Sequence, residues 1–179
     1  MPGLRSPDAG FEAPFELLAA CHERVQRSLQ LLGRLLDHLD RHGADPQAQS
    51  AAHDVWRYFE LAAPAHHRDE ELHVLPLLHA SGDAALIDAA RRIEADHEQM
   101  DRIWRELGPL LRTLADGQWG SGDANESPHA LRAAAEAFVA VHAAHVPLED
   151  DLAFPAARAR LDDAAQHAMG EEMAARRRP

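Results

Sequence analysis

The spacing of apolar positions along the chain predicts four long helices. Apolar side chains recur every three or four residues, which gives a helix one apolar face, and the expected helices cover residues 14–42, 46–79, 83–115 and 128–154. Each stretch begins near a residue suited to a helix N-terminus, namely Pro14, Pro46, Asp83 and Pro128. A shorter amphipathic helix is expected within residues 161–177. Signals for β-strands are few.

Proline and glycine predict where these helices bend or end. Gly43 should end the first helix, and Pro64 should kink the second. Gly108 and Pro109 should bend the last part of the third, and Pro155 should break or bend the fourth. The polar, glycine-containing residues 116–127 are expected to form a loop.

The expected fold is all-α. Four long helices with mostly short connections favour an antiparallel up-down four-helix bundle with a short C-terminal helix. At 179 residues the chain is long enough for one domain with a sizeable core. We expect that bundle over residues 14–177, preceded by a flexible N-terminal arm over residues 1–13, where the chain is polar and rich in proline and glycine.

Two segments of the chain nearly repeat each other. Residues 66–76 and 145–155 both read as His, three residues, Glu, five residues, Pro. On a helix, His and Glu four residues apart lie on one face, so an imidazole nitrogen and a carboxylate oxygen can hold one metal ion. Two such turns that face each other would hold two ions, with the carboxylates able to bridge them.

Two further histidines are expected at the same level of the bundle. With a rise of about 1.5 Å per residue, His22 and His66 both lie about 30 Å from the first connection, and similar counts bring His97 and His145 close to that level. All of these positions interrupt or continue apolar faces, so the expected metal ligands point into the core; they are His22, His66, Glu70, His97, His145 and Glu149. Buried carboxylates cost several kcal/mol without a partner, and a pair of metal ions would account for them.

The ligand types restrict the metal. A histidine-rich set favours iron, zinc or another borderline metal over Mg²⁺ and Ca²⁺, which prefer oxygen ligands. Two carboxylates with several imidazoles suit two irons that cycle between Fe²⁺ and Fe³⁺, with one position open for a small ligand such as O₂. The high count of 13 histidines agrees with a metal site but does not locate it.

Other residues near these positions could also serve as ligands. His67 and Glu71 form a competing pair, but the offset from Glu to Pro matches the second segment only for Glu70. Asp101 lies four residues after His97, and His142 shares a face with His145. The remaining histidines are expected on the surface or at helix caps: His38, His42, His53, His73, His79, His129 and His167. Cys21 is expected to be a packed thiol, and the terminal arginines 176–178 a solvated end.

Charge and composition exclude some classes of partner. The formal net charge of −12 argues against nucleic acid and against anionic membranes as main partners. No apolar run approaches the roughly 18 residues of a membrane span, and the N-terminus lacks the apolar run of a signal peptide. The single cysteine fits a reducing compartment, so we expect a cytoplasmic protein.

In this ordered set of residues the chain resembles the hemerythrin-like, or HHE cation-binding, family. The resemblance is carried by Cys21-His22-Glu23-Arg24, by residues 58–76, by Glu94-Ala95-Asp96-His97, by residues 145–155 and by the tail at 170–177. It implies a non-haem di-iron centre in a four-helix bundle. His22, His66, His97 and His145 would be terminal ligands, and Glu70 and Glu149 would bridge two irons that also share an oxo or hydroxo group. Zinc is a less favoured occupant.

The chain departs from the oxygen-carrying hemerythrins at two positions. Those proteins have a second histidine one turn further along the third helix, where this chain has Asp101. They also have a fourth-helix carboxylate five residues past the histidine, a spacing that Asp150 satisfies. The fifth histidine is therefore either missing or replaced by Asp101, His142 or His42, which argues against simple reversible O₂ carriage.

The expected function is therefore binding or sensing of a small diatomic ligand, O₂ or NO, or of iron itself. A di-iron enzyme acting on peroxide or NO, or an iron donor for iron–sulfur cluster repair, is the second hypothesis, although no separate acid–base pair is visible. A metal-free helical interaction module is the third. The sequence does not indicate a protein partner.

Overall fold

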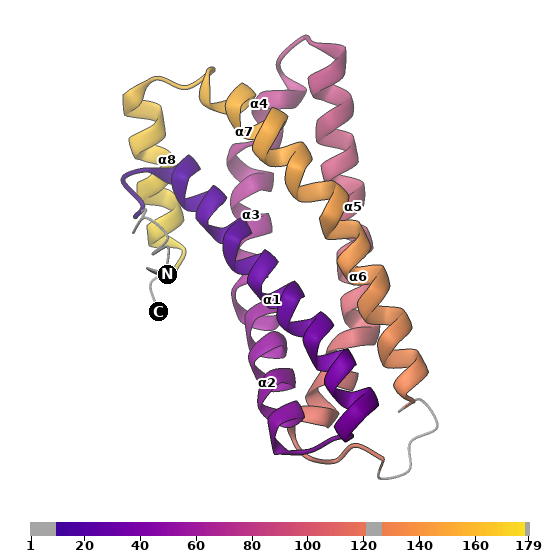
Figure 1. Cartoon of the computed structure of the whole chain (residues 1–179). Coiled ribbons are helices and arrows are strands. Elements are labelled where there is room, and N and C mark those ends of the chain that lie inside the picture. The colour runs from indigo at the N-terminus through magenta and orange to yellow at the C-terminus, as the bar shows by residue number, and fades with distance from the viewer. Residues whose placement is uncertain (1–9, 121–126, 178–179) are drawn as a thin grey trace, which may run out of the picture. The chain divides into compact units, whose positions relative to one another are not determined.

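The computed structural model describes residues 10–120 and 127–177, and within these residues all regular elements are helical (Figure 1). The elements are α1 (Pro14–His42), α2 (Pro46–Leu61), α3 (Ala63–His73), α4 (Leu75–His79), α5 (Ala84–Ala115), α6 (Pro128–Leu148), the π-helical turn η1 (Glu149–Ala153), α7 (Phe154–Arg158) and α8 (Asp163–Ala175). The all-helical class and the first and last of the expected helices are thus confirmed. Residues 1–9 of the expected arm lie outside the described residues, and residues 10–13 form a turn in which the Ala13 N–H donates to the Gly10 carbonyl.

The single kinked helix expected over residues 46–79 is wrong, because this stretch forms three helices. α2 ends at Leu61 and α3 at His73, and each break precedes a proline by two residues, Pro64 or Pro76. A proline has no N–H to continue the helical hydrogen bonds, and its ring crowds the preceding turn. The first break leaves the turn that carries His66 and Glu70 as a helix of its own.

The expected end of the fourth helix at residue 154 is also wrong. α6 ends at Leu148, but the chain stays helical through the π turn η1 and then through α7 as far as Arg158. In η1 the Phe154 N–H donates to the carbonyl of Glu149, five residues earlier. Pro155 lies in the first turn of α7, where a proline is tolerated. Pro109 likewise lies inside α5, which stays helical to Ala115.

The described residues divide into two compact units, to which α1, α5 and α6 each contribute. The described part of the second unit comprises residues 25–65, 95–120 and 127–144 and has an apolar core of its own. In that core the Phe59 ring lies 4.8 Å from Phe138 and 5.5 Å from Trp104, between ring centroids. Arg132 of α6 donates to the Asp40 carboxylate of α1 at 2.7 Å.

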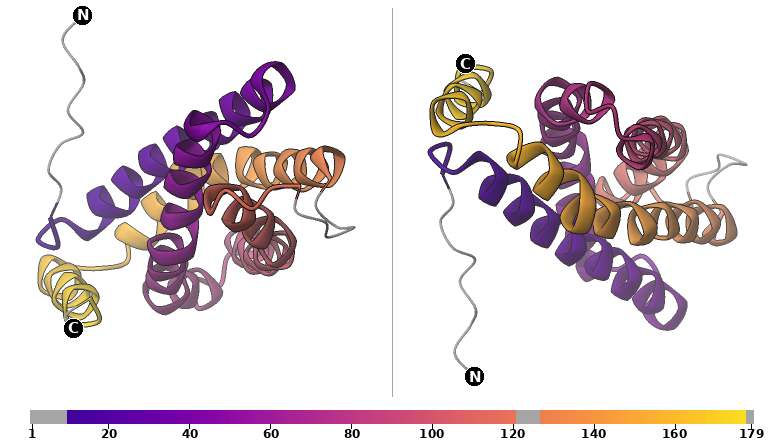
Figure 2. Two further views of the ribbon diagram at one scale, coloured as in Figure 1. Left: turned by 90° about the horizontal axis from the view of Figure 1, so that it is seen from below. Right: turned by 90° about the horizontal axis from the view of Figure 1, so that it is seen from above.

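The first unit carries the repeated His–Glu motifs. Its described part comprises residues 10–24, 66–94 and 145–177. Its core is built from buried side chains of α1, α4, α5, η1, α7 and α8, among them Phe15, Leu18, Leu78, Ile93, Ala153, Phe154, Met169 and Met173. Both views of Figure 2 show α8 beside the first turns of α1.

An ion-pair network around the buried Asp69 attaches residues 172–177 to α3, so the described arginines of the expected solvated end are exposed but also make specific contacts. Asp69 is only 1% exposed and accepts hydrogen bonds from both Arg176 and Arg177. Glu172 of α8 contacts His73 and Arg176, both at 2.6 Å. The carboxylate next to Glu70 in sequence is therefore held by the C-terminal helix.

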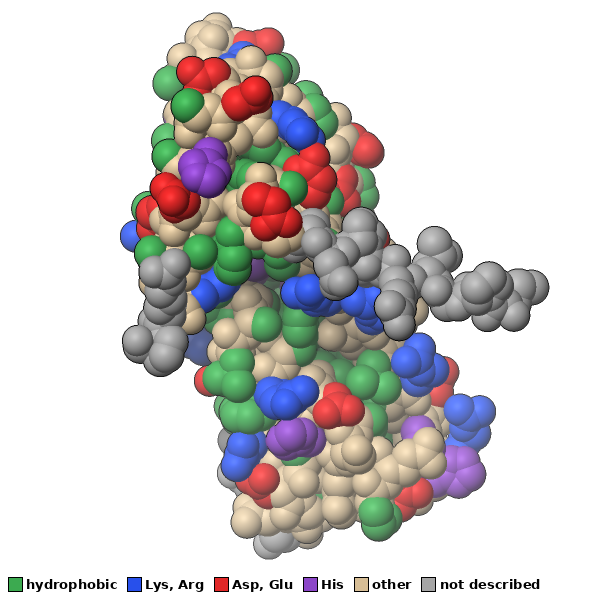
Figure 3. Space-filling model, turned by 90° about the vertical axis from the view of Figure 1, so that its left-hand side faces the viewer, with side chains coloured by type: hydrophobic (Ala, Val, Ile, Leu, Met, Phe, Trp, Pro, Cys, Tyr) green, Lys and Arg blue, Asp and Glu red, His purple; other side chains and the backbone are tan. Residues whose placement is uncertain are grey.

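The surface carries charges of both signs. On the face in Figure 3, acidic and basic side chains are interspersed with apolar ones. None of the helices in the described part of the chain combines the length and apolarity needed to cross a bilayer.

The packing of α8 predicts the effect of a core substitution. Met173 is fully buried in the first unit, so Met173→Ala should leave a cavity and lower the free energy of unfolding by about 2–5 kcal/mol. Glu171→Ala, at an exposed position of the same helix, should change it by less than about 0.5 kcal/mol. Urea denaturation of both variants checks this, and equal effects would contradict the packing described for α8.

Candidate metal centre

Both repeated motifs bring their histidine and glutamate together. On α3, His66 Nε2 lies 3.1 Å from Glu70 Oε1, and at the junction of α6 and η1, His145 Nε2 lies 3.0 Å from Glu149 Oε2. All four side chains are at most 4% exposed. The spacing of four residues thus produces the shared helix face that the sequence predicts.

His22 of α1 connects the two motifs. Its Nε2 atom lies 3.1 Å from Glu149 Oε2 and 3.7 Å from Glu70 Oε1. His22 is 2% exposed, and its ring stacks on Phe154 with 5.2 Å between centroids and contacts His66 edge-on at 4.8 Å. Three helical segments far apart in sequence therefore direct nitrogen and oxygen atoms at one buried place within the first unit.

The distances fit the coordination of metal ions. The ligand atoms of His22, His66, Glu70 and Glu149 lie within 4.8 Å of one another, and so do those of Glu70, His145 and Glu149. Two ligand atoms that are each about 2.1 Å from one ion and at right angles lie about 3 Å apart. The His–Glu distances of 3.0 and 3.1 Å match that separation.

Burial and neighbouring carboxylates shift the pKa values of His22 and His66 in the metal-free chain. Burial alone would lower the pKa of His22, but its hydrogen bonds with Asp150, Glu149 and Glu70 outweigh that effect and raise the pKa to about 11. For His66 burial dominates and lowers the pKa, although Glu70 opposes the shift. A proton on His22 thus places a positive charge beside the buried carboxylates of Glu70 and Glu149.

Asp150 has a role that the sequence did not predict. Its Oδ1 atom lies 2.8 Å from Nδ1 of His22, on the ring nitrogen that does not face Glu70 and Glu149. The sequence suggested Asp150 only as a possible carboxylate ligand of the centre. Its position next to Glu149 was the one hint in the sequence that Asp150 could lie near His22. In an ordinary α-helix, however, the two side chains would point about 100° apart.

The additional candidate ligands lie outside this cluster or in the second unit. Glu71 is exposed and pairs with Arg68 at 3.2 Å, which directs it away from the cluster. The half-buried His67 ring, by contrast, lies 5.9 Å from His66 and 6.3 Å from His145, between centroids. In the second unit His97 is buried, at 5% exposed, and stays a predicted ligand. His142 Nδ1 lies 2.8 Å from the Phe138 carbonyl, while Asp101 and His42 are exposed; these three also stay untested as ligands.

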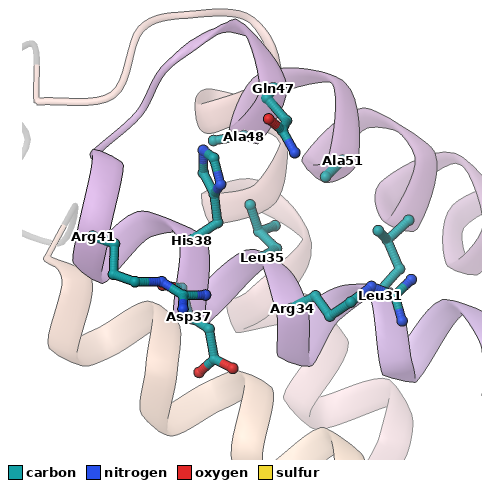
Figure 4. Close-up of a pocket in the computed structure, with 9 residues that line it drawn as sticks. All are labelled: Leu31, Arg34, Leu35, Asp37, His38, Arg41, Gln47, Ala48 and Ala51. Carbon is teal, nitrogen blue, oxygen red and sulfur yellow. The ribbon is translucent and has the colours of Figure 1, made fainter.

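Most remaining histidines lie on the surface, as expected. His38 is half-buried, and its Nε2 atom lies 2.9 Å from Asp45 Oδ1, the carboxylate that caps α2. His38 lines a surface hollow between α1 and α2 together with Arg34 and Arg41 (Figure 4). This hollow contains none of the six predicted ligands. His73 differs from the expectation because it joins the network of α8.

Comparisons with known proteins give a family match and a relative. The family model of the hemerythrin HHE cation-binding domain matches residues 13–157, which include all six predicted ligands. A relative from Haemophilus influenzae, described as an uncharacterized protein, is 33% identical over 171 residues, covering 94% of this chain and 92% of the relative.

The raised pKa of His22 predicts a pH dependence of stability in the metal-free protein. Because the folded-state pKa is raised from 6.5 to about 11, the stabilisation by the charged ring is complete below pH 6.5 and is lost as the pH rises through about 11. The free energy of unfolding should therefore fall over this range more steeply for the wild type than for His22→Gln. Urea denaturation at several pH values tests this, and parallel curves for the two proteins would contradict it.

Proposed function

Since the chain belongs to the hemerythrin HHE cation-binding family, we propose that it is a non-haem di-iron protein that binds or senses a small diatomic ligand, O₂ or NO, or iron itself. One observation carries this proposal: Glu70 and Glu149 are both 0% exposed and face the imidazoles of His22, His66 and His145. The arrangement suits cations better than it suits a metal-free core.

The energetics of burial support a metal. Two carboxylates removed from water cost several kcal/mol each unless positive charge or hydrogen bonds compensate them. Within the first unit the charge available at the cluster is the proton of His22, one positive charge for two carboxylates. Divalent ions bound in place of that proton would bring more positive charge to the carboxylates, and neutral imidazoles would complete their coordination.

The proposed ligands come from every long stretch of helix. His22, His66 and His145 would hold the ions through ring nitrogens, and the carboxylates of Glu70 and Glu149 would be shared between them. His97 of α5 is proposed as the fourth terminal histidine. The proposal includes the antiparallel up-down arrangement of four helices over residues 14–177, because that fold brings one histidine from each helix to a common level.

Iron is proposed over zinc because a mixed set of imidazole and carboxylate ligands can hold both the ferrous and the ferric ion. When bound, a pair of irons would supply reversible one-electron chemistry and an open coordination position. The chain's own contribution is exclusion of bulk water and of large molecules, since the five ligands of the first unit are at most 3% exposed. A cytoplasmic location remains a prediction.

Neutral substitutions of the two glutamates test the proposal. Glu70→Gln and Glu149→Gln should each lower the bound iron and abolish the stabilisation that metal confers, because metal binding is linked to folding. Metal content by elemental analysis and the melting temperature with and without ferrous iron are the measurements.

Glu71→Gln is the matched control, since it changes the same charge on the same helix at an exposed position. It should keep the metal and the stabilisation. If the Glu70 and Glu149 variants instead melt at or above the wild-type temperature, and ferrous iron stabilises none of the proteins, the chain is a metal-free helical module.

A further inference from the structure

We propose that Asp150 is a positioning residue for the metal centre, which fixes the ring of His22 so that Nε2 is the nitrogen offered to the metal. The inference rests on the proposed function and extends it to a residue outside the ligand set. The imidazole of His22 would bind a transition-metal ion, and Asp150 would affect that ion only through His22.

The two nitrogens of His22 have different partners. Nδ1 lies 2.8 Å from Asp150 Oδ1, whereas Nε2 lies 3.1 Å from Glu149 Oε2 and 3.7 Å from Glu70 Oε1. The first contact is at the partly exposed edge of the centre, because the Asp150 side chain is 36% exposed. The second is in its interior, where Glu70 and Glu149 are at most 1% exposed.

This arrangement selects one tautomer of the neutral ring. A carboxylate only accepts hydrogen bonds, so Asp150 retains the hydrogen on Nδ1. The lone pair of the neutral imidazole is then on Nε2 and directed at the buried carboxylates. A carboxylate at Nδ1 also makes Nε2 a better electron-pair donor to a metal ion, and it fixes the orientation of the ring.

The π turn explains how two consecutive residues serve one histidine. Glu149 and Asp150 begin η1, and both reach the ring of His22, one at each nitrogen. In an α-helix consecutive side chains point about 100° apart. The longer hydrogen-bonded loop of η1, closed from the Phe154 N–H to the Glu149 carbonyl, widens the helix at this point. Such turns are frequent at functional sites.

Direct coordination by Asp150 is the competing interpretation. The Asp150 carboxylate lies at Nδ1 of His22. Among the described residues, the side-chain clusters compact enough to hold a metal ion include Glu70 and Glu149 but not Asp150. The structure therefore assigns Asp150 to the ring and not to the ion.

Metal release provides the first test. Wild type, Asp150→Ala, Asp150→Asn and the control Asp151→Ala are loaded with zinc, and its transfer to a chelator is followed. Asp151 is exposed on the same turn, so its loss removes the same charge beside the site. We expect Asp150→Ala to weaken zinc binding about 10- to 100-fold, and Asp151→Ala to match the wild type. Asp150→Asn keeps an acceptor oxygen but loses the charge, so its zinc affinity should lie between those of the wild type and Asp150→Ala.

The tautomer of His22 provides a readout that a merely structural role would not change. In the zinc-loaded, ¹⁵N-histidine-labelled protein, long-range ¹H–¹⁵N correlation should show His22 with a hydrogen on Nδ1 and metal on Nε2. In Asp150→Ala the Nδ1 proton should exchange faster with solvent and its resonance should shift. If Asp150→Ala does not fold, Asp150→Asn carries the same comparison.

The outcomes separate this inference from the function on which it rests. If the wild type binds zinc and iron but Asp150→Ala holds them as tightly as Asp151→Ala does, the positioning role is refuted and the proposed function stands. If metal is found on Nδ1, the positioning role is likewise refuted. If the wild type binds no metal, the proposed function itself fails.

Discussion

The structure of the first unit depends on the burial of two carboxylates against three imidazoles. Glu70 and Glu149 are fully buried, and His22 lies between them with a pKa raised to about 11. Apolar side chains of similar volume would usually make a more stable core than a buried ionic cluster. Stability alone therefore does not explain the cluster, whereas a metal-binding role does. The surrounding helices bring its carboxylates and imidazoles together.

The irregular helix segments follow from that requirement. The break before Pro64 gives His66 and Glu70 a short helix of their own, and the network of Asp69, Arg176 and Arg177 attaches this helix to α8. On the other side of the cluster, the π turn brings Glu149 and its neighbour to the two nitrogens of His22. Prolines and a rare helical turn thus lie next to the ligands, where regular geometry would place the side chains differently.

The sequence predicted those parts of the site that depend on local spacing. The pairs His66–Glu70 and His145–Glu149 lie together because residues four apart share a helix face, and His22 joins them from the expected helix. The contacts of Asp150 and Asp69 could not be predicted, since one needs a π turn and the other joins residues more than 100 positions apart. The fourth helical stretch continues past the expected end at residue 154, to Arg158, because proline is tolerated in a first helical turn. His97 remains a predicted ligand.

The iron content of tag-free protein purified without oxygen tests the central claim most directly, together with the visible spectrum before and after exposure to air. We expect about two irons per chain, as in di-iron helical bundles, and a near-ultraviolet to visible band that appears on oxygenation. Fully helical protein that holds no metal, and that neither ferrous iron nor zinc stabilises, would contradict it.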